Sequence, residues 1–311
     1  MWEYHKPVML KESVVSLACR RGGIYVDGTV GGGGHAYEIL KRIYPEGLLI
    51  GIDRDEEAIR AAAERLEAFG DRKILVKANF ADIANVVRDL KIDGVDGILL
   101  DLGVSSHQVD APERGFSFMQ NSRLDMRMDR SQRLDAHTLV NTQTERELMR
   151  IIRDYGEEEK AGRIVRAIMK RRSVAPIETT LELASLVAEA VPGRAGRSRI
   201  HPATRTFQAL RIAVNDELSG LTKAIPEAIR TLRSGGRLSV ISFHSLEDRI
   251  VKNIFRDEAA ACNCPPHLPV CVCKKRPSVR LITKKAIKSG EEEAEINPRS
   301  RSARLRTAER I

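Results

Sequence analysis

A short apolar segment that ends in a carboxylate and leads directly into a glycine-rich turn constrains the fold of this chain most strongly. Residues 23–27 predict a buried strand that ends at Asp27, and Gly28-Thr29-Val30-Gly31-Gly32-Gly33-Gly34-His35 follows it. Apolar residues at helical spacing then predict a helix over residues 36–43. A strand, a glycine turn and a helix in this order begin a βαβ unit, so the sequence predicts an α/β fold.

Further strands continue this alternation. Residues 48–53 and 97–101 predict two strands that each end in a carboxylate. Residues 74–78 predict a further strand that does not end in a carboxylate. In open α/β sheets, ligands bind at the edge formed by the carboxyl ends of the parallel strands. The carboxylates expected at that edge are Asp27, Asp53 and Asp101.

The strand pattern stops after Asp101. Helices are predicted at 144–155, 160–172 and 180–190, with no convincing strand among them. We therefore expect an all-helical insertion at residues 109–205, within a discontinuous core made of residues 1–108 and 206–311.

The sequence returns to the core through a long helical pattern. Residues 207–232 predict one helix with a break near Pro226, because proline cannot donate the backbone hydrogen bond of a helix interior. The polar segment 288–302 is predicted to be a loop. The remaining strands are expected at 238–242, within 279–286 and at 303–309.

Charge is concentrated in two parts of the chain. The net charge is +9, with eleven Lys and Arg against three Glu in residues 160–214 and twelve against five in residues 274–311. Two basic segments on an otherwise acidic body favour a nucleic-acid partner, and a solvated basic surface is the alternative. No apolar run reaches the roughly 20 residues that span a bilayer, and no secretory leader pattern is present, so a cytoplasmic location is expected.

The glycine turn alone does not identify its ligand, because it also loosely fits a dinucleotide-binding fingerprint. Asp27 distinguishes between a dinucleotide and S-adenosylmethionine as the ligand. A carboxylate at this position would repel the pyrophosphate of a dinucleotide but suits the ammonium and sulfonium of S-adenosylmethionine. Asp53 matches the acidic residue that accepts hydrogen bonds from ribose hydroxyls. Phe80 is a candidate for packing on adenine, and a core aromatic is the alternative interpretation.

Several longer motifs point to one family. They are the turn Asp27–His35, Gly97–Ser106, Arg114–Phe118, Leu124-Asp125-Met126-Arg127-Met128-Asp129, His201–Ala209, Ser242–Arg249 and Asn297–Ser302. In these motifs and their order, the chain resembles the bacterial RsmH (MraW) family of ribosomal RNA small-subunit methyltransferases, essentially from end to end.

The resemblance implies a class I (Rossmann-like) S-adenosylmethionine-dependent methyltransferase core with an inserted helical domain that recognises RNA. The implied reaction is methylation of the exocyclic N(4) amine of a decoding-centre cytidine in 16S rRNA. The implied partner is 16S rRNA or the small ribosomal subunit, both of which stay open as substrates. The implied cofactor contacts are Gly33, Gly34, His35, Asp53, Phe80, Asp101 and Gln108.

The chemistry of an aromatic amine narrows the catalytic candidates. Its lone pair is delocalised, so the enzyme must align the amine and offer acceptors for its hydrogens. We expect Asp101, or the carbonyls after it, to accept these hydrogens, with Ser105 nearby. His244 is a candidate for relaying the proton, and an anchoring role toward Glu247 or Asp248 is the alternative.

Two further sets of residues suggest binding sites. The arginines predicted to contact RNA are Arg194, Arg197, Arg199, Arg299 and Arg301, with Arg304 and Arg306 as further candidates. The cysteine cluster consists of Cys262, Cys264, Cys271 and Cys273. In a reducing compartment this cluster predicts either a structural zinc site or plain loop thiols.

Other functions compete with this interpretation. A DNA amine methyltransferase would have a Pro-Pro-aromatic turn after the fourth strand, where this chain has Leu102-Gly103-Val104. Asp27 argues against a nicotinamide-dependent dehydrogenase. A non-enzymatic nucleic-acid-binding protein would leave the three strand-end carboxylates unexplained.

Overall fold

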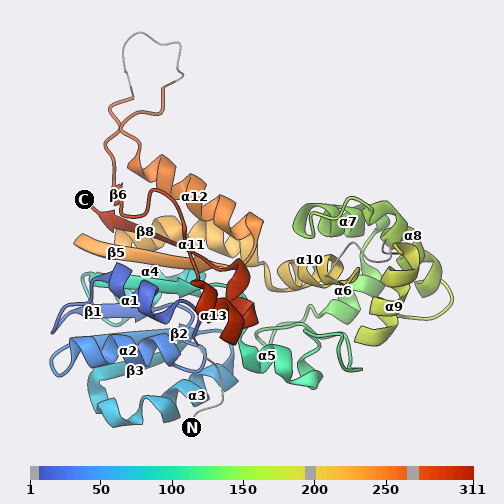
Figure 1. Cartoon of the computed structure of the whole chain (residues 1–311), viewed down its shortest axis with the longest axis horizontal. Helices are drawn as coiled ribbons and strands as arrows, with labels where there is room; N and C mark the ends of the chain where they lie inside the picture. Colours follow the sequence, from blue (N-terminus) through green and yellow to red (C-terminus); the bar gives the residue numbers. More distant parts are fainter. Residues whose placement is uncertain (1–6, 193–200, 265–272) are drawn as a thin grey trace. The chain divides into compact units, whose positions relative to one another are not determined.

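The chain folds into two compact units. The structure is a computed structural model, and it describes residues 7–192, 201–264 and 273–311. The first unit comprises Met1–Gly103 and Leu218–Ile311, and the second comprises Val104–Glu217 (Figure 1). Within the described residues, none of the helices combines the length and the apolar character needed to cross a membrane.

A mixed sheet forms the centre of the first unit. Its strands run in the order β3-β2-β1-β4-β5-β8-β6, and β7 also pairs with β8. The strands are β1 (Ile24–Asp27), β2 (Leu48–Asp53), β3 (Lys73–Lys77), β4 (Val95–Asp101), β5 (Leu232–Ser242), β6 (Val279–Leu281), β7 (Ile287–Lys288) and β8 (Arg304–Arg310). The first five are parallel and β8 is antiparallel to β5. This arrangement confirms the expected class I (Rossmann-like) methyltransferase core.

Helices cover both faces of this sheet, which explains why its parallel strands are apolar on both sides. One face packs against helices α1 (Leu10–Leu17), α2 (Gly34–Ile43) and α3 (Glu56–Arg65). The other face packs against α4 (Ile83–Asp89), α11 (Glu217–Thr231) and α12 (Ser245–Ala259). Ile98-Leu99-Leu100 in β4, at the centre of the sheet, is fully buried between them.

The regular elements among the described residues of the second unit are helices, apart from one isolated bridge between Arg123 and Thr179, and residues 115–135 are otherwise irregular. Its helices are α5 (Ser106–Asp110), α6 (Ala136–Thr142), α7 (Glu145–Arg150), α8 (Ala161–Arg172), α9 (Thr180–Ala190) and α10 (Thr204–Asn215), and a π-helical turn Ile151–Tyr155 follows α7. These helices enclose a separate apolar core that includes Leu148, Ile164 and Leu183.

The return to the core differs from the sequence predictions in three ways. The helical pattern at 207–232 breaks at Asp216, which adopts a left-handed conformation with φ 48°, and α11 continues through Pro226. Helix α10 packs Phe207 and Leu210 into the core of the second unit, so this unit extends to Glu217. The segment 288–302, predicted as a loop, contains helix α13 (Glu291–Ile296) and a 3₁₀ turn at Pro298–Ser302.

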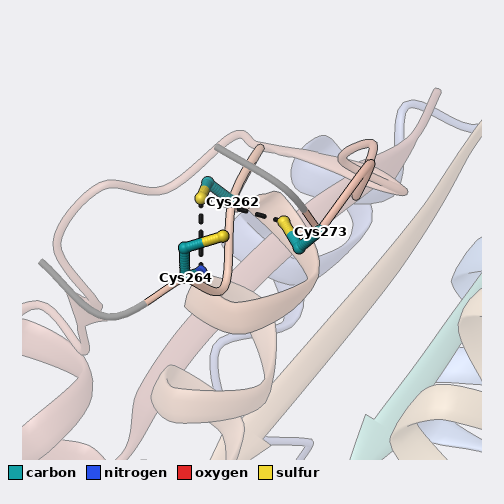
Figure 2. Close-up of side chains that lie close together, drawn as sticks. All are labelled: Cys262, Cys264 and Cys273. Atoms are coloured by element: carbon teal, nitrogen blue, oxygen red, sulfur yellow. Dashed lines mark hydrogen bonds between the residues drawn. The ribbon is translucent and has the colours of Figure 1, made fainter. Parts of the chain in front are cut away.

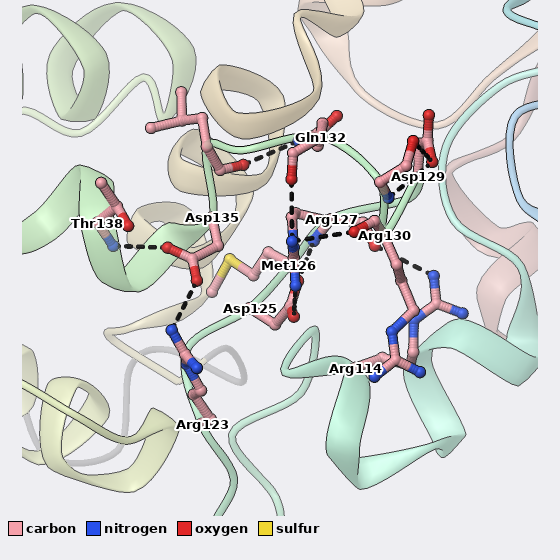
Figure 3. Close-up of polar contacts among 12 residues, drawn as sticks. Arg114, Arg123, Asp125, Met126, Arg127, Asp129, Arg130, Gln132, Asp135 and Thr138 are labelled. Carbon is pink, nitrogen blue, oxygen red and sulfur yellow. Dashed lines mark hydrogen bonds and ion pairs between the residues drawn. The ribbon is translucent and has the colours of Figure 1, made fainter.

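The unusual string at residues 124–129 has a structural role in the second unit (Figure 3). Arg127 donates from Nε and Nη2 to the two oxygens of Asp125, at 2.8 and 2.7 Å, and from Nη1 to the carbonyl of Gln132 at 2.9 Å. Arg114, only 1% exposed, donates to the carbonyls of residues 127 and 128. These hydrogen bonds hold an irregular segment in one conformation where no helix or strand could satisfy its backbone.

Asn215 anchors the same segment from α10. Its side-chain oxygen accepts from the backbone N–H of Met128 at 2.8 Å, and its side-chain nitrogen donates to the carbonyl of Met126 at 2.7 Å. We expect Asn215→Ala to lower the free energy of unfolding by about 2–4 kcal/mol, because two buried backbone groups lose their partners. Denaturant unfolding measures this loss. Ser131→Ala, at an exposed position of the same segment, should change it by less than about 0.5 kcal/mol, and equal effects of the two variants would contradict the assignment.

Candidate cofactor-binding edge of the sheet

Three carboxylates gather where adjacent parallel strands end. Asp27, Asp53 and Asp101 are the last residues of β1, β2 and β4, and β1 lies between β2 and β4 in the sheet. Burial is the main cause that raises the pKa of Asp101 and of Asp27, and repulsion from Asp27 adds to the first shift and repulsion from Asp53 to the second. The sheet therefore places three carboxyl groups close together at one edge, as the strand pattern predicted.

The glycine turn brings backbone to this edge at close range. Gly31 and Gly33 have φ of +49° and +76°, a conformation that residues with a side chain rarely adopt. The N–H of Gly31 donates to Asp53 Oδ2 at 2.9 Å, and Gly33 is the N-cap of α2. A Cβ on Gly34 would lie 3.0 Å from Cγ of Pro7. The turn is thus fixed against β2 and packs closely against Pro7.

Asp27 is the most deeply buried of the three carboxylates, at 1% exposure. Its Oδ1 accepts from the N–H of Thr29 at 3.2 Å, whereas its buried Oδ2 has no hydrogen-bond partner in the part of the chain that the structure describes. Burial raises its pKa to about 7. Near neutral pH the site therefore holds a carboxyl group that gains from any positively charged ligand placed at Oδ2.

Asp53 is held by backbone on both oxygens. Oδ2 accepts from Gly31 and Oδ1 accepts from the N–H of Asp55 at 2.9 Å. Burial raises the pKa of Asp53 to about 6, against the lowering effect of these two hydrogen bonds. Each carboxylate oxygen has a second lone pair, so Asp53 can still accept hydrogen bonds from a ligand.

Asp101 faces the ring of His35. Its Oδ2 lies 3.6 Å from Nδ1 of His35, and its buried Oδ1 has no partner among the described residues. Burial, followed by the charges of Asp27, Glu247 and Glu293, raises the pKa of Asp101 well above its usual range. The family resemblance implied that His35 contacts the cofactor, and nothing local in the sequence predicts where its ring points.

The position of the His35 proton follows from its other contact. Nε2 lies 3.0 Å from the carbonyl of Val8, which can only accept, so Nε2 carries a hydrogen. The lone pair of Nδ1 in the neutral ring then faces a carboxylate oxygen, and the contact becomes favourable when one proton is shared between the two. The Asp101–His35 pair is therefore suited to taking up a proton.

His244 is placed where it can anchor the start of α12 through Glu247. It is the N-cap of α12, with Nδ1 accepting from the N–H of Glu247 at 3.5 Å and Nε2 lying 3.1 Å from Glu247 Oε1. Glu247 in turn accepts from the backbone N–H groups of residues 243 and 244. The capping box uses Nδ1 of the ring, which agrees with the anchoring interpretation, whereas the buried Nε2 makes no hydrogen bond among the described residues. The proton relay therefore stays a prediction.

Ser105 and Gln108 belong to the second unit, where they form a capping box at the start of α5. Ser105 Oγ accepts from the N–H of Gln108 at 3.2 Å, and Gln108 Oε1 accepts from the N–H of Ser105 at 3.1 Å. Phe80 follows β3 in the first unit, partly buried against the core, with the guanidinium of Arg54 5.9 Å from its ring centroid. Its ring is thus available for a flat ligand on only part of its surface.

Several basic side chains have structural partners. Arg172 donates to the carbonyls of residues 140 and 143, and Arg304 and Arg306 both pair with the buried Asp248. Arg299 and Arg301 lie exposed in the 3₁₀ turn after α13. The predicted arginines 194, 197 and 199 lie outside the described residues. Arg299, Arg301 and Arg304 are exposed tail arginines, so all three stay candidates for contacts with a polyanion.

Comparison with known proteins gives one consistent result. The model of the MraW methylase family matches residues 3–311. A relative from Syntrophus aciditrophicus, named ribosomal RNA small subunit methyltransferase H, is 59% identical over 100% of this chain and 98% of its own length. A relative of the same name from Geotalea uraniireducens is 58% identical over 99% of both chains. The solved structure of an rRNA methylase from Streptococcus thermophilus aligns over 100% of this chain and 99% of its own, with 10% identity and a TM-score of 0.42.

Proposed function

Since this chain belongs to the MraW methylase family, we propose that it transfers a methyl group from S-adenosylmethionine to the exocyclic N(4) amine of a decoding-centre cytidine in 16S rRNA. The observation that carries the choice of cofactor is the buried Oδ2 of Asp27 beside the glycine turn, which has no hydrogen-bond partner among the described residues. The choice of RNA is supported by relatives at 58–59% identity that are named small-subunit rRNA methyltransferases.

The residues at the sheet edge fit S-adenosylmethionine in charge and in hydrogen-bonding capacity. When bound, this cofactor supplies an activated methyl group on a sulfonium. Asp27 would bind its ammonium, Asp53 would accept hydrogen bonds from its ribose hydroxyls, and Phe80 would pack against its adenine. A dinucleotide would instead bring a pyrophosphate toward three carboxylates, which repel it.

Asp101 and His35 would handle the amine. Asp101 Oδ1, which is buried and has no partner among the described residues, would accept a hydrogen bond from the amine and orient it. As the nitrogen gains a carbon, its acidity rises and the proton passes to Asp101 Oδ1. The carboxyl group then loses its negative charge, which relieves the repulsion between Oδ2 and the lone pair of His35 Nδ1. Ser105 stays a candidate for hydrogen bonding near the amine, and Gln108 stays a candidate contact to the cofactor.

The helical second unit is proposed to recognise RNA in the cytoplasm, as free 16S rRNA or within the small subunit. Arg299 and Arg301 would contribute phosphate contacts from the first unit. A zinc ion at the cysteine cluster would have no part in the reaction. A DNA amine methyltransferase remains the alternative substrate class, and a non-enzymatic nucleic-acid-binding protein the alternative functional class.

Methyl transfer to defined small subunits tests this function. We expect the purified protein and S-adenosylmethionine to convert one decoding-centre cytidine to N(4)-methylcytidine in subunits from cells that lack the protein, as mapped by mass spectrometry of RNA fragments. Subunits from cells that contain the protein should accept almost no methyl groups, because that position is already modified. Methylation of DNA alone, or tight binding of NAD without binding of S-adenosylmethionine in calorimetry, would overturn the proposal.

A further inference from the structure

Three cysteines converge in the segment that connects α12 with β6. Cys262 and Cys264 follow the end of α12, and Cys273 precedes β6 on the returning chain (Figure 2). Their Sγ atoms all lie within 4.8 Å of one another. Cys262 and Cys273 are exposed, although free cysteines are among the most buried residues in proteins. Apolar packing therefore does not explain why these thiols meet.

The sulfur separation is that of two ligands on one metal ion. Sγ of Cys262 and Sγ of Cys273 are 3.8 Å apart. In a tetrahedral zinc site with Zn–S bonds of about 2.3 Å, neighbouring sulfurs are about 3.8 Å apart. A disulfide would require about 2.05 Å. The backbone thus holds the two sulfurs at the spacing that a tetrahedral ion needs.

Backbone N–H groups point at two of the sulfurs. The N–H of Cys264 donates to Sγ of Cys262 at 3.2 Å, and the N–H of Asn263 donates to Sγ of Cys273 at 3.4 Å. Donors directed at sulfur favour the thiolate, which is the form that binds metal. The ammonium of Lys275 hydrogen-bonds Asn263 Oδ1 at 2.7 Å and adds a positive charge to the same loop.

We propose that Cys262, Cys264 and Cys273 bind one Zn²⁺ ion, which fixes the segment between α12 and β6. Three protein thiolates leave one position of a tetrahedral ion for a further ligand. Cys271, which the sequence groups with the other three, lies outside the described residues and is tested separately below.

This metal site lies at the opposite edge of the sheet from the three carboxylates. Helix α12 begins just after β5, whose end pairs with Asp101, and its 15 residues run back over about 22 Å. Its end is joined to the start of β6 by a hydrogen bond from the N–H of Ser278 to the carbonyl of Glu258, at 2.9 Å. The zinc is therefore structural, and its loss should leave the cofactor-binding edge intact.

Metal analysis of the full-length protein, purified without chelators, tests the proposal. We expect about one zinc per chain by mass spectrometry, and at least a fivefold loss in Cys262→Ser, Cys264→Ser and Cys273→Ser. Cys19→Ser is the matched control, because Cys19 is a partly buried thiol with its pKa raised to about 11 by burial, and it should retain the metal. Binding of S-adenosylhomocysteine should stay within about twofold in all four variants, which separates this proposal from the proposed function.

Cobalt substitution gives a test that does not depend on any variant folding. The wild-type protein loaded with Co²⁺ should show the sulfur-to-metal charge-transfer bands and visible bands of a tetrahedral thiolate site. Weaker charge-transfer absorption in Cys271→Ser would assign the fourth ligand to that residue, and an unchanged spectrum would support the three-thiolate site alone. Absence of zinc together with an octahedral cobalt spectrum, or a Cys262–Cys273 disulfide in the protein kept under reducing conditions, would overturn the proposal.

Discussion

Asp27→Asn is expected to stabilise the ligand-free protein at pH 8 and, at the same time, to weaken the binding of S-adenosylmethionine by about 100-fold or more. The loss of affinity follows from removing the charge that pairs with the ligand's ammonium in a buried site. The gain in stability follows from removing a buried carboxylate whose Oδ2 lacks a partner among the described residues. Asparagine keeps the acceptor for the N–H of Thr29.

The stability gain should depend on pH with a definite sign. The folded protein holds the Asp27 proton up to a pKa of about 7, whereas the unfolded chain loses it near the ordinary value of about 3.9. Between these values the unfolded state binds fewer protons, so the contribution of Asp27 to stability falls as the pH rises. Asp27→Asn should therefore raise the melting temperature by several degrees at pH 8, and by progressively less as the pH is lowered toward 4.

Calorimetric titration and thermal unfolding check both effects. Asp96→Asn is the matched control, since Asp96 lies near the start of β4, at the end of the strand opposite to Asp101. Its carboxylate accepts from the N–H of Ile24 at 2.8 Å. It should leave cofactor affinity within about twofold. An Asp27→Asn protein that binds S-adenosylmethionine as tightly as the wild type would show that Asp27 does not contact the cofactor.

Asp101→Ala is expected to lower kcat by a factor of about 10²–10⁴, the usual contribution of a positioned proton acceptor. Binding of S-adenosylhomocysteine should weaken by less than about tenfold, so that the cofactor site can still be saturated. Single-turnover methylation of small subunits measures the chemical step directly. Turnover at the wild-type rate with the cofactor bound would remove Asp101 from the reaction.

The pH profile distinguishes a proton-accepting pair from a merely structural contact. Because burial and like charges raise the pKa of Asp101, the acid limb of kcat should lie at higher pH than for an ordinary carboxyl group. His35→Asn should lower kcat and move that limb to lower pH, since Nδ1 no longer stabilises the protonated carboxyl. A His35→Asn protein with reduced kcat but an unmoved acid limb would indicate that His35 only supports the fold.

The carboxylate edge could be predicted from sequence because parallel strands have a fixed direction. Once the apolar segments before Asp27, Asp53 and Asp101 are taken as neighbouring parallel strands, their ends must meet. The pairing of His35 with Asp101 could not be predicted in this way. The ring of His35 is oriented by the carbonyl of Val8, 27 residues earlier in the chain, and no periodicity records such a contact.

The errors of the sequence analysis have physical causes of the same kind. Apolar residues keep their helical spacing on both sides of Asp216, so the pattern gives no sign of the break between α10 and α11, whereas Pro226 gives a misleading one. Helix α13 was missed because it is short and acidic. It is held by a tertiary contact in which Glu293 accepts from the N–H of Met9 at 2.7 Å.

Strand β8, formed by residues 304–310, lies between β5 and β6 and pairs with both. During synthesis, residues 104–217 leave the ribosome as one continuous segment and can fold early, since domains fold as units. The sheet is completed only once residues 304–310 have been made. A chain that lacks these residues would leave β5 and β6 with unpaired edges, so such a product should aggregate rather than persist as a shortened enzyme.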